Sequence, residues 1–305
     1  MSFASDVKDE ICREKLSRAC CIRAEAYGAL LFCNTFTTER VRIVTQNPSV
    51  AQHLPKLFRR AFGVSFDVRP ADLNAGGRLS FEINSPPSMA VILDAYGYAR
   101  ENSISHHINF AVLEESCCHA AFLRGAFLVG GSVTDPEKRY HLEIGTTHIH
   151  VQRELQALLL EMELEGKTTS RGANYITYFK RSETIADLLT TVGAPLSAME
   201  IMNAKLEKSL RNGMNRWSNC DVANVDKAVE AAQTQIEAIR RLGMDGLEAL
   251  PEKLRDTARM RVDNPELSLS QLAELAGVSK SCMNHRLRKL SELAHQMEES
   301  RYIEQ

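Results

Sequence analysis

The segment from Ser279 to Leu290, near the C-terminus, concentrates side chains that can bind an anionic, hydrogen-bonding surface. It contains four lysines and arginines and no acidic residue, although the whole chain has a net charge of −2. A helix capped by Ser279 would bury Met283, Leu287 and Leu290 on one face, because their spacing matches the helical repeat. The polar side chains would then point outward: Lys280, Ser281, Asn284, His285, Arg286, Arg288 and Lys289.

These outward side chains are of the types that recognise double-stranded DNA. The N-terminal part of a recognition helix lies nearest the bases in the major groove. Asparagine pairs well with adenine and lysine with guanine. The side chains expected at base edges are Lys280, Ser281, Asn284 and His285. Those expected at phosphates, where contacts fix the register and supply salt-dependent affinity, are Arg286, Arg288 and Lys289.

The preceding residues predict the rest of a helix-turn-helix, over about residues 268–290. Ser268 or Ser270 can cap a first helix. Ala273 is small enough to let two helices cross closely, and Gly277 allows a tight turn in which a Cβ would be strained. Val278 is expected to be buried against the helix pair. An ordinary basic helical hairpin does not need this combination, so the pattern favours DNA binding.

An internal repeat dominates the first two-thirds of the chain. Residues 20–31 match residues 117–128 at a constant offset, with a Cys-Cys pair and a Gly-Ala pair in each copy. Each copy is predicted to be a helix whose Gly-Ala step lets another helix approach closely. Two such units are expected to face each other across a pseudo-twofold axis, with these helices at the seam.

The same order of elements is predicted after each copy of the repeat helix, giving αββαββα twice. In the first repeat, about 20–98, the strands are 34–36, 41–45, 64–68 and 78–83, and the helices are 48–62 and 88–98. In the second, about 117–192, the strands are 132–134, 141–145, 167–170 and 173–179, and the helices are 148–162 and 182–192. The predicted fold class is α+β, with this duplicated domain spanning residues 1–193.

The duplicated pattern resembles the LAGLIDADG homing endonucleases, whose paired motif helices join two αββαββα halves. The nuclease chemistry of that family requires an acidic residue five positions after each motif glycine. In this chain Gly28 leads to Cys33 and Gly125 leads to Gly130. Neither residue can hold Mg²⁺, because hard divalent cations prefer oxygen ligands. The domain is therefore interpreted as an inactive relative.

The eight cysteines and the apolar pattern bear on cofactors and on the cellular compartment. No CxxC motif occurs, so reduced, mostly buried thiols are expected. The pairs Cys20-Cys21 and Cys117-Cys118 could approach across the pseudo-twofold, with His119 nearby, as a thiolate metal site. Small buried residues at helix starts explain them more simply, and no metal or cofactor is expected.

With no long apolar run and no secretory signal, the chain is expected to be cytoplasmic, without membrane contact.

The last third is predicted to be all-helical after a linker. A helix over about 196–211 and a loop form the linker, residues 194–218. The polar stretch 211–224, with the only tryptophan, Trp217, is interpreted as a capped loop, the alternative being a DNA-contacting segment. Further helices are predicted over about 222–242, ended by Gly243, and over 250–262. The helical DNA-binding domain would span residues 219–305.

Four stretches together make the chain resemble the WhiA family: 122–128, 215–224, 277–281 and 284–290. The resemblance implies a transcription factor linked to cell division and chromosome segregation, and to sporulation in some relatives, without nuclease activity. It also implies promoter binding mainly through the C-terminal domain, a nucleoid-associated location and, in sporulating actinobacteria, a WhiB-type partner.

Three functions remain in competition on the sequence. The leading hypothesis is a sequence-specific, DNA-binding regulator that is not an enzyme. The alternative is a DNA-cleaving endonuclease of the LAGLIDADG type, which Cys33 and Gly130 disfavour. In the third, the repeat domain is a platform for a ligand or a protein that sets the activity of the regulator.

Overall fold

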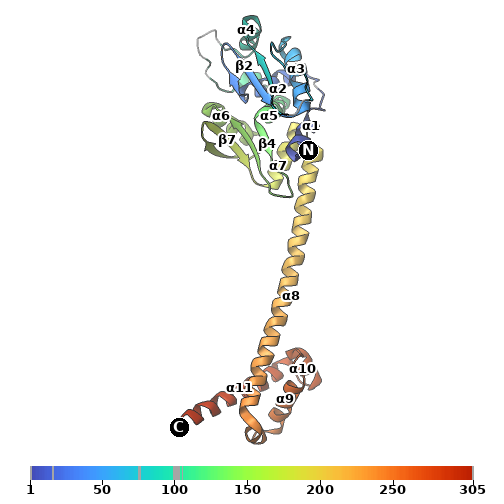
Figure 1. Cartoon of the computed structure of the whole chain (residues 1–305), viewed down its shortest axis with the longest axis vertical. Coiled ribbons are helices and arrows are strands. Elements are labelled where there is room, and N and C mark those ends of the chain that lie inside the picture. Colours follow the sequence, from blue (N-terminus) through green and yellow to red (C-terminus); the bar gives the residue numbers. More distant parts are fainter. Residues whose placement is uncertain (1, 16, 75–76, 99–103, 105, 304–305) are drawn as a thin grey trace. The chain divides into compact units, whose positions relative to one another are not determined.

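The computed structural model describes residues 2–15, 17–74, 77–98, 104 and 106–303, without the side chains at 218, 220–225 and 298–303. The chain forms two compact units, residues 1–208 and 209–305. The first unit mixes helices and strands, and the described part of the second contains helices, which confirms the predicted α+β class (Figure 1). The division at residues 193 and 218 stays a prediction.

The first unit contains the two predicted repeats. The first repeat is built from α2 (Ala19–Leu31), β1 (Thr35–Phe36), β2 (Val41–Thr45), α3 (Pro48–Phe62), β3 (Leu79–Ile83) and α4 (Pro86–Ala95). The second consists of α5 (Ser116–Gly130), β4 (Gly131–Val133), β5 (Leu142–Thr146), α6 (Ile149–Glu161), β6 (Lys167–Arg171), β7 (Asn174–Phe179) and α7 (Ser182–Val192). The antiparallel sheets have the orders β1-β2-β3 and β4-β5-β7-β6. Two elements not predicted are α1 (Phe3–Ile11) and the 3₁₀ turn η1 (Phe110–Val112).

The strand predicted over 64–68 is wrong. Only Val68 forms a β-bridge, to Glu82, so the first sheet has one strand fewer than the second. The segment packs instead of pairing: Phe66 is buried, with its ring 4.8 Å from that of Phe58 and 5.2 Å from that of Phe81. Aromatic rings at these separations stabilise the core, so the apolar run that resembled a strand serves as a core anchor.

The repeat helices α2 and α5 lie side by side between the two sheets (Figure 1). A Cβ built on Gly28 would be 2.1 Å from the Phe122 carbonyl oxygen, and one on Gly125 would be 1.9 Å from that of Glu25. These reciprocal close approaches show that the two glycines let the helix backbones touch. The seam between these helices is the middle of one hydrophobic core that both repeats share. The sequence repeat predicts that the two helices meet there.

Helix α8 (Pro195–Glu248) corrects the predicted linker loop, because residues 211–224 are helical throughout. The stretch contains no proline, and its one glycine, Gly213, costs a helix only about 1 kcal/mol relative to alanine. The flanking helices therefore continue through it. Trp217 is 73% exposed on this helix, and the DNA-contacting alternative for the segment stays a prediction. At Gly243 the backbone leaves the helical region (φ 67°), so the predicted interruption there is confirmed.

Three further helices follow: α9 (Glu252–Asp263), α10 (Leu269–Leu275) and α11 (Lys280–Ile303). They share a second hydrophobic core with the end of α8. Helix α11 continues beyond Leu290, where the predicted motif ends. None of the described helices combines the length and the apolar character needed to cross a bilayer.

A stacked pair of imidazoles in the first unit predicts acid sensitivity. The rings of His106 and His148 are 3.7 Å apart and nearly parallel. Burial, and then the neighbouring His106, lower the pKa of His148 from 6.5 to about 4. The unfolded chain therefore takes up this proton first, and stability is lost as the pH falls from about 6.5 to about 4. Because His148 is only partly buried, we expect a loss of about 1–2 kcal/mol.

The His148→Gln variant should lose less stability over this pH range than the unchanged protein does. Urea unfolding at several pH values measures the difference. His150→Gln is the matched control, because His150 is exposed two residues further along the same helix. Identical pH profiles for the unchanged protein and His148→Gln would contradict the assignment.

Candidate nucleic-acid interface

The turn before α11 has the capping and backbone geometry that the sequence predicts. Of the two candidate caps for α10, Ser268 is the one used. Its hydroxyl accepts a hydrogen bond from the Gln271 amide, and the Gln271 side chain accepts one from the Ser268 amide, at 3.3 and 2.9 Å. Gly277 has a φ of 63°, a left-handed conformation that a residue with a Cβ rarely adopts. The prediction that this glycine makes the turn is confirmed.

Beneath the motif, small and apolar side chains hold α10 and α11 together. Met283, Leu287 and Leu290 are at most 1% exposed, which confirms the predicted inward face of α11. Ala273 of α10 is buried where this helix packs against α11. Val278 is only partly buried, although it packs against this core as expected.

The first turn of α11 and its outer face carry the predicted polar residues. The Ser279 hydroxyl accepts a hydrogen bond from the Cys282 amide at 3.2 Å, so Ser279 caps the helix. Six of the seven predicted side chains are exposed: Lys280, Ser281, Asn284, His285, Arg288 and Lys289. Arg286 is half-buried on the flank. The structure therefore brings all seven to one helix, and their contacts with DNA stay a prediction.

The sequence reasoning missed one residue of this surface, Glu292. Its carboxylate lies 3.4 Å from Arg288 Nε and 3.7 Å from Lys289 Nζ. The i,i+4 and i,i+3 spacing was the available signal. Two of the three cations expected at phosphates are therefore held by an intrahelical carboxylate, which competes with DNA for them.

Removing the Glu292 charge should strengthen DNA binding. Exposed ion pairs of this kind are worth about 0.3–0.5 kcal/mol each, so releasing both predicts a gain of about three- to fivefold in affinity for Glu292→Gln. Chromatin immunoprecipitation identifies a DNA sequence that the protein binds. Fluorescence anisotropy with a labelled duplex of that sequence then measures the affinity of each variant. Glu252→Gln, which removes an exposed charge from α9, is the control. Unchanged or weaker binding by Glu292→Gln would show that the pairs do not compete with phosphate.

In the first unit, the positions that correspond to nuclease acids cannot supply a metal-binding carboxylate. Cys33 is buried and its thiol donates to the Thr35 carbonyl oxygen at 3.0 Å. Burial raises the pKa of this thiol to about 12. At Gly130 a Cβ would lie 2.6 Å from the Gly145 carbonyl oxygen, so no side chain fits without displacing backbone.

A pocket lies beside Cys33 and Gly130, and Glu143 is the one carboxylate among its described lining residues. That carboxylate is 3.1 Å from His141 Nε2 and 3.8 Å from an Arg171 nitrogen. Two-metal and single-metal cleavage both depend on carboxylates available to the ion. Here the carboxylate has cationic or hydrogen-bonding partners already.

Comparison with known proteins agrees with both halves of the structure. The WhiA LAGLIDADG-like domain matches residues 119–211, and the WhiA C-terminal HTH domain matches residues 214–294. A full-length DUF199/WhiA crystal structure from Thermatoga maritima superposes with a TM-score of 0.60 at 22% identity, covering 97% of this chain and 99% of that one. This likeness shows a shared fold.

Two relatives match over nearly the whole chain. The "Probable cell division protein WhiA" of Ruminiclostridium cellulolyticum is 37% identical over 309 residues, 97% of this chain and 98% of the relative. The protein of the same name from Bacillus subtilis is 35% identical over 310 residues, 97% of each chain. With identity at this level from end to end, and with the duplicated domain and the helix-turn-helix both in place, the chain belongs to the WhiA family.

Proposed function

We propose that this protein is a sequence-specific regulator of transcription that binds double-stranded promoter DNA through α11. The observation that carries the proposal is the outer face of α11, where six of the seven predicted polar and cationic residues are exposed above a fully buried apolar stripe. The first part of α11, up to Leu290, is basic and contains no acidic residue, and such a helix within a helix-turn-helix is suited to the major groove. The whole chain has a net charge of −2, so the positive charge that attracts DNA is concentrated on this surface.

Each side chain of this face has a proposed role. The residues near the N-terminus of α11 contact base edges: Lys280, Ser281, Asn284 and His285. The later cations contact phosphates: Arg286, Arg288 and Lys289. This division follows from the way a recognition helix enters the groove with its N-terminal end leading.

The biological role is proposed from the relatives. They are named probable cell division proteins, which supports a role in cell division for this chain. Chromosome segregation and a nucleoid-associated place in the cytoplasm belong to the same proposal, as does a WhiB-type partner of the kind that relatives in sporulating actinobacteria have. Absence of nuclease activity is also proposed, because Cys33 and Gly130 occupy the positions of the acids.

Two variants test the DNA-binding face. Asn284→Ala should cost about 1–3 kcal/mol of binding free energy at cognate sites only, because it removes a base contact. Arg288→Ala should weaken binding to all sequences and lower the salt slope by about one, because it removes a phosphate contact. Equilibrium binding to a cognate and a scrambled duplex at several salt concentrations separates the two.

The matched control is Lys253→Ala, which removes an exposed cation from α9 of the same unit. Equal losses for Lys253→Ala and Arg288→Ala would mean that net charge alone, and not this face, governs affinity. Nicking of a plasmid pool in the presence of Mg²⁺ would instead favour the endonuclease alternative.

A further inference from the structure

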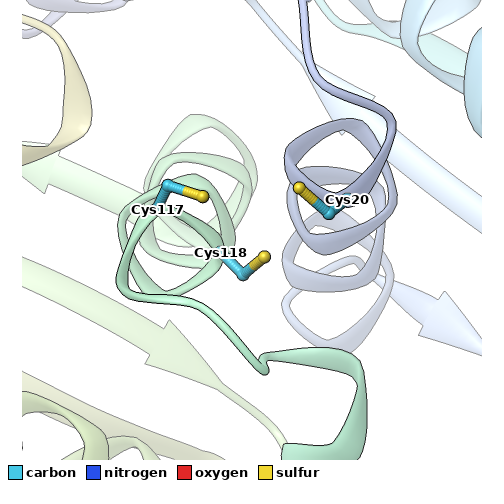
Figure 2. Close-up of side chains that lie close together, drawn as sticks. All are labelled: Cys20, Cys117 and Cys118. Carbon is cyan, nitrogen blue, oxygen red and sulfur yellow. The ribbon is translucent and has the colours of Figure 1, made fainter.

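The first turns of α2 and α5 carry a group of cysteines from both repeats. Cys20 lies in the first turn of α2, and Cys117 and Cys118 lie in the first turn of α5. The two helices touch through Gly28 and Gly125, so these turns are held next to each other. Figure 2 shows the three sulfur atoms directed into the space between the helices, and all three lie within 4.8 Å of one another.

The sulfur separations are close to those of a metal–thiolate site. Zinc–sulfur bonds of about 2.3 Å in a tetrahedron place neighbouring sulfurs about 3.8 Å apart. The group needs to contract by about 1 Å at most, which small side-chain rotations at an open surface can supply. Cys20 is exposed, Cys117 is half-buried and Cys118 is buried, so an ion can enter from solvent and meet a closed inner wall.

A fourth ligand is within reach. The Cys21 sulfur lies 4.0 Å from that of Cys20 and donates to the Cys117 carbonyl oxygen at 3.6 Å. His119, which the sequence placed near the pairs, is directed elsewhere, because its Nε2 lies 3.0 Å from the Leu113 carbonyl oxygen. The ligands available are therefore sulfurs, which select borderline or soft ions such as zinc over Mg²⁺.

The electrostatic surroundings favour thiolates at this place. The group sits at two helix N-termini, where backbone amides favour negative charge. The Arg18 guanidinium is 3.7 Å from the Cys117 sulfur.

We propose that Cys20, Cys117 and Cys118 form a zinc-type thiolate site that ties the two repeats together at the seam, with Cys21 as the fourth ligand. Each thiol that ligates the ion releases its proton to solvent, and no oxidation occurs. Because the ligands come from both repeats, binding should stabilise the packing of α2 against α5.

Titration of the reduced, full-length protein with Co²⁺ and then Zn²⁺ tests this proposal. We expect one equivalent of Co²⁺ to produce thiolate-to-cobalt charge-transfer absorption, which one equivalent of Zn²⁺ then removes. Zn²⁺ should also raise the melting temperature. Cys20→Ser and Cys117→Ser, neither of which changes a fully buried residue, should each weaken binding by about 100-fold or more.

Cys282→Ser is the matched control, because it removes a cysteine from the other unit, and it should bind as the unchanged protein does. Equal binding by Cys20→Ser, Cys117→Ser and Cys282→Ser would overturn the site. So would a disulfide between Cys20 and Cys117 on exposure to air, in a protein whose reduced form binds no Co²⁺, because the cysteines would then be a redox pair.

Discussion

Gly125→Ala is expected to lower the free energy of unfolding of the first unit by about 4 kcal/mol or more. The added methyl group would lie 1.9 Å from the Glu25 carbonyl oxygen and 2.9 Å from the Ala29 amide nitrogen. Both atoms belong to the backbone of α2, so no side-chain rotation relieves the clash. The helices must separate instead, and the seam between the repeats opens.

Gly28→Ala should behave in the same way, because its methyl group would lie 2.1 Å from the Phe122 carbonyl oxygen on α5. Urea unfolding followed by circular dichroism measures both variants. Gly213→Ala is the matched control, since that glycine lies within α8 with no atom within 4 Å of an added Cβ. It should stabilise the helix by up to about 1 kcal/mol. Unfolding midpoints of Gly28→Ala and Gly125→Ala near that of the unchanged protein would show that the helices do not touch at these glycines.

These glycines also show why the duplicated fold could be predicted from the sequence. A seam where two backbones touch tolerates only glycine, so both copies keep the Gly-Ala step at the same offset. The helix-turn-helix could be predicted for a different reason. Its cap, its left-handed glycine and its apolar stripe are local features, which depend on residues close together in the sequence.

The strand predicted over 64–68 and the loop predicted over 211–224 are wrong because distant contacts or helix cooperativity determine the conformation there. Phe66 belongs to an apolar run that looks like a strand, but the rings of Phe58 and Phe81 draw it into the core. Residues 211–224 have the composition of a loop, and the flanking turns of α8 nevertheless extend through them. The convergence of the cysteine sulfurs depends on side-chain directions across the seam, which a repeat pattern suggests but does not specify.

Arg261 is expected to hold the segment that connects α9 to α10, and Arg261→Met should lower the free energy of unfolding of the second unit by about 3–5 kcal/mol. Arg261 is 2% exposed and is among the largest fully buried side chains of the described chain. Its guanidinium donates to the carbonyl oxygens of Asn264 and Leu267, at 2.8 and 2.6 Å. Methionine fills similar space but donates nothing, so these carbonyls lose their charged partner where α9 leads into α10.

Thermal unfolding followed by circular dichroism measures this loss, with Arg259→Met as the control, because Arg259 is exposed on the same helix. The control should stay within about 0.5 kcal/mol of the unchanged protein. DNA-binding measurements distinguish a structural role of Arg261 from a direct contact with DNA. Arg261→Met should lose affinity on warming, as the folded fraction falls, while its salt slope at low temperature stays unchanged. A reduced slope at low temperature would mean that Arg261 reaches a phosphate, and that it does not stay buried when the protein binds DNA.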